Sequence, residues 1–243
     1  MIKQRTIKRE VEIEGVGLQT GRPVKLKLKG SPANSGINFI RTDLPNKPLL
    51  NVRDIAFDDA SPKERRTTLG IGPLEIQTTE HLLAAVSGLS IDNIVIEIDS
   101  VEPPGLDGSS KGFVEILKSA GFAEQDAPRR ILKIAAAVWC AAGDSILIAL
   151  PDEDFKISFT LSYGSYKLGA QFFSITLNEE NFENEIAPAR TFCLEEEALE
   201  LLKRGLGKGA DYKNTLVIGK DGPIENSLRF PDELVRHKVL DLI

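Results

Sequence analysis

The sequence has few of the residues on which many familiar sites are built. Its 243 residues include two cysteines, two histidines and one tryptophan. Cys140 and Cys193 can form at most one disulfide and match no metal-ligand spacing, which argues against a disulfide scaffold and a cysteine-based zinc site. We expect two reduced, mostly buried thiols.

Long apolar runs and an excess of basic residues are also missing. The runs "ILKIAAAVWCAAG" and "ILIAL" are too short to span a bilayer, and the charged opening "MIKQRTIKREVEIEG" lacks the apolar core of a signal peptide. Acidic residues outnumber basic ones by 36 to 30, which gives no support for a nucleic-acid partner. We expect a cytoplasmic protein without a transmembrane segment.

What is present is typical of a folded globular protein, with 42% hydrophobic and 27% charged residues. The length allows one large domain or two of ordinary size. Period-two alternation predicts a hairpin over residues 11–30 and a strand over 93–99, whereas apolar stripes at helical spacing predict helices over 78–89 and 109–122.

The polar stretch "AEQDAPRR", residues 123–130, is the best candidate for a linker, after which the strand pattern begins again near Arg129. The last helix is expected to start at "FPDE", with Pro231 in its first turn. Two successive units of strands and helices indicate an α+β protein with two similar domains, residues 1–125 and 126–243, each a layer of β-strands packed on helices.

The two histidines lie beside carboxylates on predicted helices. His237 and Asp241 are four residues apart, so both can face one metal ion, and His81 could supply a third ligand next to Glu80 as a base. An alternative is a solvated charged face of the last helix. Neither histidine lies in a local signature of a serine or cysteine nucleophile.

Seven stretches along the chain resemble one family, the bacterial UDP-3-O-acyl-N-acetylglucosamine deacetylases, zinc amidases of lipid A biosynthesis. The stretches are "EGVGLQTG", "RRTTLG", "TTEHLLAAVSGLSIDNIVIEID", "EPPGLDGSSKGFVEIL", "ARTFCLEEE", "GLGKGADYKNTLVIG" and "LRFPDELVRHKVLDLI". The resemblance implies that His81, His237 and Asp241 bind Zn²⁺ and that Glu80 is the general base. It also implies two domains joined as a sandwich, with the zinc site at their junction.

Further roles follow only from the resemblance. Thr191 resembles the hydroxyl that stabilises the oxyanion, while Phe192 and Lys238 resemble substrate-contacting residues. Residues 193–221 are similar to a βαβ insert that forms a passage for the substrate's acyl chain. The implied reaction is hydrolysis of the N-acetyl group of a UDP-linked sugar by a monomeric enzyme of a Gram-negative bacterium.

The resemblance ends at Ile243, before the family's Gly-His segment, whose histidine is the general acid. From this we expect weaker zinc binding and little or no turnover. An alternative is a non-catalytic homologue that binds UDP-sugar or acyl chain. An unrelated zinc amidohydrolase is disfavoured by "GLGKGADYKNTLVIG".

Overall fold

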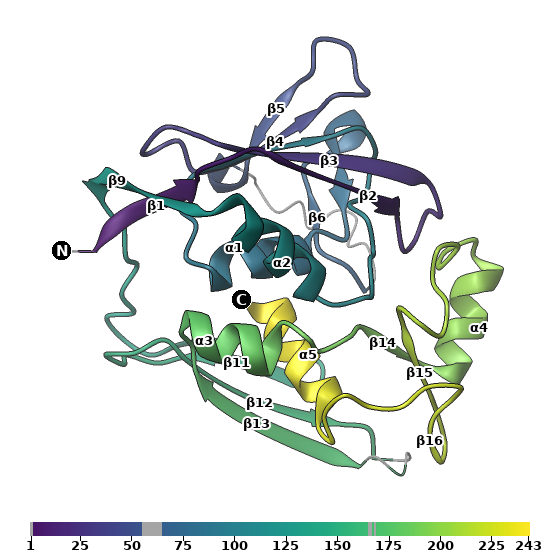
Figure 1. The fold of residues 1–243 in the computed structure, drawn as a ribbon. Coiled ribbons are helices and arrows are strands. Elements are labelled where there is room, and N and C mark those ends of the chain that lie inside the picture. Colours follow the sequence, from purple (N-terminus) through teal and green to yellow (C-terminus); the bar gives the residue numbers. More distant parts are fainter. Residues whose placement is uncertain (1, 55–64, 165–166, 168) are drawn as a thin grey trace.

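The computed structural model describes residues 2–54, 65–164, 167 and 169–243, and it combines helices with several β-sheets. The predicted α+β class is confirmed. Figure 1 shows α1 and α2 beneath one sheet, and α3 and α5 above the strands of the second half of the chain. None of the helices in these residues has the length and apolar character that a membrane crossing requires.

The first half of the chain contains the larger sheet and two of the α-helices. Its elements are β1 (Lys3–Ile7), β2 (Val11–Val16), β3 (Pro23–Gly30), β4 (Ile37–Arg41), β5 (Leu49–Asn51), η1 (Val52–Asp54), β6 (Thr68–Leu69), η2 (Gly72–Leu74), β7 (Ile76–Gln77), α1 (Glu80–Gly88), β8 (Ile94–Ile98) and α2 (Lys111–Ala120). Five of the strands form one sheet in the order β2-β3-β8-β4-β5. The predicted hairpin is confirmed, since β2 and β3 pair antiparallel.

The second half carries shorter sheets. Its elements are β9 (Phe122–Pro128), β10 (Val138–Ala142), β11 (Ser145–Ala149), β12 (Lys156–Ser162), β13 (Ala170–Thr176), α3 (Glu179–Asn181), η3 (Phe182–Ile186), β14 (Phe192–Leu194), α4 (Glu195–Lys203), β15 (Leu216–Gly219), β16 (Gly222–Pro223) and α5 (Glu233–Leu242). Strands β14 and β15 pair in parallel with α4 between them, which makes this stretch a βαβ unit.

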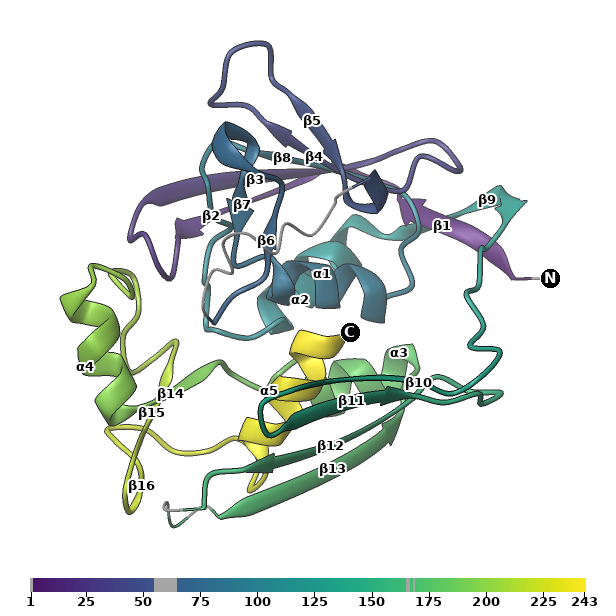
Figure 2. The ribbon, with the colours of Figure 1, turned by 180° about the vertical axis from the view of Figure 1, so that it is seen from behind.

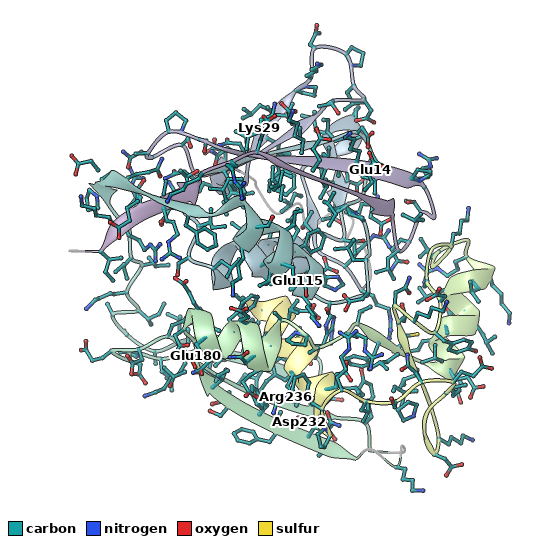
Figure 3. The ribbon with its side chains drawn as sticks, viewed as in Figure 1. Glu14, Lys29, Glu115, Glu180, Asp232 and Arg236 are labelled. Atoms are coloured by element: carbon teal, nitrogen blue, oxygen red, sulfur yellow. The ribbon has the colours of Figure 1, made fainter. Side chains whose placement is uncertain are left out.

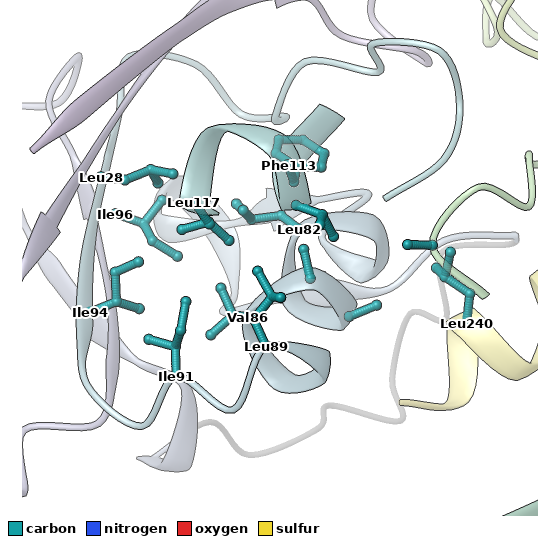
Figure 4. Packing of buried hydrophobic residues seen from close by; sticks show 14 of the residues in the cluster. Leu28, Leu82, Val86, Leu89, Ile91, Ile94, Ile96, Phe113, Leu117 and Leu240 are labelled. Carbon is teal, nitrogen blue, oxygen red and sulfur yellow. The ribbon is translucent and has the colours of Figure 1, made fainter. Parts of the chain in front are cut away.

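The main core lies between the five-stranded sheet and α1 and α2. Alternation in β3 and β8 turns every second side chain inward, because successive residues of a strand face opposite sides. Figure 4 shows Leu28 and Ile96 of the sheet facing Leu82 of α1 and Phe113 of α2. All four are at most 1% exposed, so this layer excludes water.

Helix α5 packs against α1 on one side and against the β12–β13 hairpin on the other, as Figures 1 and 2 show. Its buried apolar side chains are Leu234, Val235, Val239 and Leu240. At its outer start, Arg236 donates from Nε to Asp232 Oδ1 at 2.6 Å, and Figure 3 shows these two side chains together. The C-terminal turn of α5 therefore comes to lie near the first turn of α1.

The β10–β11 hairpin contrasts with the main core, because it pairs with no other strand of the described residues. Its apolar side chains remain exposed, including Trp139 at 71% and Ile148 at 53%. Cys140 lies on this hairpin and is exposed, so the prediction of two mostly buried thiols is wrong for Cys140, whereas Cys193 is buried.

Three local predictions are wrong. The linker predicted at residues 123–130 is largely strand β9, which pairs with β1 through backbone groups and needs no apolar side chains to do so. The boundary drawn at residue 125 therefore falls inside a strand. Residues 129–137 were expected to form a strand, but the strand begins only at β10. Helix α5 begins at Glu233, so Pro231 lies before its first turn and not within it.

Candidate metal centre

His81 enters the site from the first turn of α1. Its side chain is buried, at 3% exposure, and its Nε2 atom has no hydrogen-bond partner among the described residues. The backbone carbonyl of His81 accepts a hydrogen bond from Ser110 Oγ at 2.7 Å, which ties α1 to the start of α2. A buried ring nitrogen without a partner is costly unless something else binds it, and a metal ion is the usual solution.

His237 and Asp241 enter from the last two turns of α5. His237 is 2% exposed, and its Nδ1 donates to the carbonyl oxygen of Ala189 at 3.0 Å. This hydrogen bond places the proton on Nδ1 and leaves the lone pair on Nε2. Nε2 in turn lies 3.4 Å from Oδ1 of Asp241.

These three side chains converge on one point although α1 and α5 are far apart in the sequence. One potential ligand atom from each lies within 4.8 Å of the others, and the two imidazole rings are 5.1 Å apart in an edge-on arrangement. Ligands at about 2.0–2.2 Å from a tetrahedral zinc ion are separated by about 3.4 Å, which matches the His237–Asp241 spacing. Two imidazoles and one carboxylate are a donor set typical of catalytic zinc.

The electrostatics favour the metal-binding form of each group. Burial, with a smaller contribution from His237, lowers the pKa of His81 to about 3, and burial also lowers the pKa of His237. Burial acts to raise the pKa of Asp241, but the neighbouring His237, in its protonated form, and the charge and hydrogen bond of Lys238 outweigh burial and hold this pKa below its ordinary value. At neutral pH the site offers neutral imidazoles and a carboxylate, as metal binding requires.

Glu80 lies beside the three potential ligands, one residue before His81. Its Oε2 accepts a hydrogen bond from the backbone N–H of Thr67 at 3.0 Å. Burial, followed by the negative charge of Asp241, raises its pKa to about 8. With this pKa the carboxyl group of Glu80 is mostly protonated at neutral pH in the metal-free protein, and a positive charge bound beside it would favour the carboxylate form that a general base requires.

Thr191 lies on the segment that joins η3 to β14 and is fixed at both backbone groups. Its N–H donates to the Gly108 carbonyl at 2.7 Å, and its carbonyl accepts from the Leu216 N–H at 2.9 Å. Gly108 has φ +79°, and a Cβ there would lie 1.7 Å from the carbonyl oxygen of Asn214. Only glycine permits this close approach, so Gly108 holds the Thr191 segment in place.

Phe192 and Lys238 meet at the edge of the potential metal site. The Phe192 ring lies 6.3 Å from the His237 ring, and Lys238 Nζ lies 5.4 Å from the Phe192 ring centre. Lys238 Nζ also donates to Asp241 Oδ2 at 2.6 Å, which leaves Oδ1 on the side of His237. All seven site residues named from the sequence therefore fall in two neighbouring groups, around α1 and around α5.

A largely apolar cavity of about 280 Å³ adjoins Thr191 and Phe192. It runs between α4 and the loop after β2, and its apolar lining includes Leu18, Leu199, Leu202, Ala210 and Val217. Such a cavity can accept an aliphatic chain next to the metal site.

Sequence reasoning missed the groups that orient the site. The Ala189 carbonyl that holds His237 is a backbone atom and has no signature of its own. Arg190 and Glu233 form a buried ion pair between this segment and α5. Two hints of this ion pair are present in the sequence. Arg190 is a charged residue inside "ARTF", and Glu233 lies four residues before His237, on the same face of the helix.

Comparison with known proteins finds relatives along almost the whole chain. The family model LpxC, described as UDP-3-O-acyl N-acetylglycosamine deacetylase, matches residues 4–243. A protein of Chlamydia pneumoniae named UDP-3-O-acyl-N-acetylglucosamine deacetylase is 42% identical over 246 residues, which cover 99% of this chain and 85% of that protein.

Two further relatives carry the same name. The one from Chlamydia abortus is 40% identical over 242 residues, 99% of this chain and 85% of the relative. The one from Thermodesulfovibrio yellowstonii is 39% identical over 240 residues, 99% of this chain and 80% of the relative. On the extent of these matches, the chain belongs to the LpxC family of UDP-3-O-acyl N-acetylglycosamine deacetylases.

Proposed function

We propose that this protein hydrolyses the N-acetyl group of UDP-3-O-acyl-N-acetylglucosamine and releases acetate, as a step of lipid A biosynthesis. The observation that carries the proposal is the convergence of two buried histidines and an aspartate in a chain of this family. We propose zinc as the metal, bound by His81, His237 and Asp241, because neutral imidazoles and a carboxylate suit it. When bound, zinc supplies Lewis acidity that makes a water molecule a stronger nucleophile and polarises a carbonyl group.

The chain's own residues then have distinct tasks. Glu80 accepts the proton of the attacking water, for which a carboxyl group next to the metal is needed. The hydroxyl of Thr191 donates a hydrogen bond to the oxygen of the acetamide carbonyl as negative charge develops on it. Phe192 packs on the sugar, and Lys238 offers its positive charge to the substrate, in keeping with their contact beside His237.

We further propose that the acyl chain occupies the apolar cavity beside Phe192, with residues 193–221 as one wall. In the same proposal, residues 1–125 and 126–243 are two similar α+β domains joined as a sandwich, except that the last residues of β9 stay with the first domain through their pairing with β1, and the zinc site lies at the junction. The origin of His81 in α1 and of His237 in α5 supports this division. We place the protein in the cytoplasm as a monomer that acts on this small-molecule substrate.

The test is a single-turnover assay with substrate labelled in the acetyl group. Against the expectation of little or no turnover, this proposal predicts that protein loaded with one equivalent of Zn²⁺ releases labelled acetate and that the chelated protein does not. Glu80→Gln should retain zinc and lower the rate by about 10²–10⁴-fold, because it removes the base alone. Glu115→Gln is a matched control, since Glu115 is 67% exposed on α2, and it should leave the rate unchanged.

Other outcomes separate the alternatives. Substrate binding without acetate release would support a non-catalytic homologue. Zinc binding that survives His81→Ala unchanged would refute the metal centre itself.

A further inference from the structure

The buried ion pair between Arg190 and Glu233 lies near the site but has no role in the proposed reaction. We propose that Arg190 and Glu233 are positioning residues, which fix the ring of His237 and the hydroxyl of Thr191 relative to each other. The proposal rests on the proposed function for its catalytic meaning, while its structural content concerns His237 alone.

The carboxylate of Glu233 is fully buried and accepts four hydrogen bonds. Arg190 donates from Nε to Oε1 at 2.9 Å, from Nη2 to Oε2 at 3.1 Å and from its backbone N–H to Oε1 at 3.0 Å. The backbone N–H of Arg229 donates to Oε2 at 2.6 Å. Such a two-pronged pair fixes direction as well as distance, which a single hydrogen bond does not.

The guanidinium of Arg190 also binds a third segment. Its Nη1 donates to Asn226 Oδ1 at 3.0 Å, and its Nη2 donates to the Ser227 carbonyl at 2.6 Å. Arg190 thereby joins the 189–191 segment, the 226–229 loop and the first residue of α5. Lysine cannot reproduce this pattern, because it lacks the planar fork of donors.

The position of the pair in the chain connects it to both functional groups. Glu233 precedes His237 by four residues, so the two lie on one face of α5. Arg190 stands between Ala189, whose carbonyl accepts from His237 Nδ1 at 3.0 Å, and Thr191. The pair therefore holds both ends of the hydrogen bond that orients His237.

A role in attaching α5 to the rest of the protein does not account for the pair. The helix already buries Leu234, Val235, Val239 and Leu240. Buried ion pairs contribute little to stability compared with apolar residues of the same volume, because desolvation offsets their attraction. What the pair adds to this packing is a fixed register between α5 and residues 189–191.

The test uses Arg190→Lys, which keeps the charge and loses the fork. The matched control is Arg129→Lys, because Arg129 donates from Nε and Nη2 to Asp92 at 3.0 and 2.8 Å, beyond the end of α1 opposite to His81. With only two histidines in the chain, ¹⁵N NMR of the imidazoles resolves the tautomer of His237. Metal-free wild type and Arg129→Lys should show a single tautomer protonated at Nδ1, and Arg190→Lys a mixture.

A second readout uses the metal. Arg190→Lys should change the visible absorption of the Co²⁺-loaded protein and lower kcat by about 10–100-fold, with KM within about threefold, as for other groups that orient a metal ligand. Glu233→Gln should act in the same direction, and Arg129→Lys should change neither quantity.

An unchanged His237 tautomer in both Arg190→Lys and Glu233→Gln would overturn the proposal, whatever their stability. If the wild type released no acetate, the proposed function would fail, yet the NMR comparison would still decide the role of the pair.

Discussion

Two parts of this molecule made of equally apolar sequence have opposite environments. The five-stranded sheet packs on α1 and α2, where Leu26, Ile96 and Phe113 are almost completely buried. The β10–β11 hairpin is at least as apolar, yet Trp139 and Ile148 are more than half exposed. Apolar composition therefore determines strand formation in both places, whereas burial depends on which other elements lie against each strand.

The difference matters for the site, because only the packed part reaches it. His81 is carried by α1, whose other residues lie in the main core, so the position of the ring follows from that packing. The β10–β11 hairpin contributes none of the residues that surround the potential metal ion. Changes in the core should thus disturb both stability and metal binding, and changes in the hairpin should affect neither.

The largest expected effect is on the free energy of unfolding, when one aromatic side chain is removed from the main core and another from the β10–β11 hairpin. Phe113→Ala should lower the free energy of unfolding by about 3–5 kcal/mol, because it removes buried contacts and leaves a cavity. Trp139→Ala should change it by less than about 0.5 kcal/mol, as is usual for surface positions. Urea unfolding of both variants measures the difference, and equal losses would mean that the hairpin is covered in solution.

A smaller effect is the pH dependence of stability, which arises from His81 on α1, next to the main core. The pKa of His81 is about 3 in the folded protein and about 6.5 when unfolded. Between these values the unfolded chain binds more protons, so the stability contributed at neutral pH is lost as the pH falls below 6.5. Metal-free protein should lose about 1–2 kcal/mol between pH 6.5 and 5 relative to His81→Gln, as judged by urea unfolding.

Glu80 opposes this trend and provides a check on it. Its folded pKa of about 8 lies above the unfolded value, so its stabilising contribution is lost as the pH rises toward 8. The loss runs from about pH 4.5, the ordinary pKa of a glutamate, to about pH 8, so Glu80→Gln should remove this downward slope across that whole interval. Parallel pH curves for wild type and His81→Gln would contradict the burial of a neutral imidazole.

The sequence predicted the fold where pattern and environment agree. Alternation in residues 11–30 and 93–99 correctly predicted strands, because one side of each faces the core. The alternation pattern did not predict β9, because the side chains of this strand are mostly polar and the strand is formed by backbone hydrogen bonds with β1. The expectation of a buried Cys140 was also wrong, because the hairpin that carries it pairs with no other strand of the described residues.

The sequence predicted which residues belong to the candidate site, but it did not predict how they are arranged in space. Spacing places His237 and Asp241 on one face of a helix, whereas no local pattern reveals that this helix meets α1. The hydrogen bond from His237 to Ala189 involves a backbone carbonyl, which the sequence does not distinguish from any other. Arg190 and Glu233 were visible as charges, but their pairing depends on the fold that brings residue 190 to the start of α5.

The smallest expected effect provides a direct test of the comparison itself, because Trp139 is the only tryptophan in the chain. With 71% of its surface exposed, its fluorescence should resemble that of tryptophan in water, and acrylamide should quench it almost as well as in guanidinium chloride. A blue-shifted, protected emission would show that the hairpin is covered. If that protection disappeared on dilution, a second copy of the chain would be the cover, and the proposed monomer would be wrong.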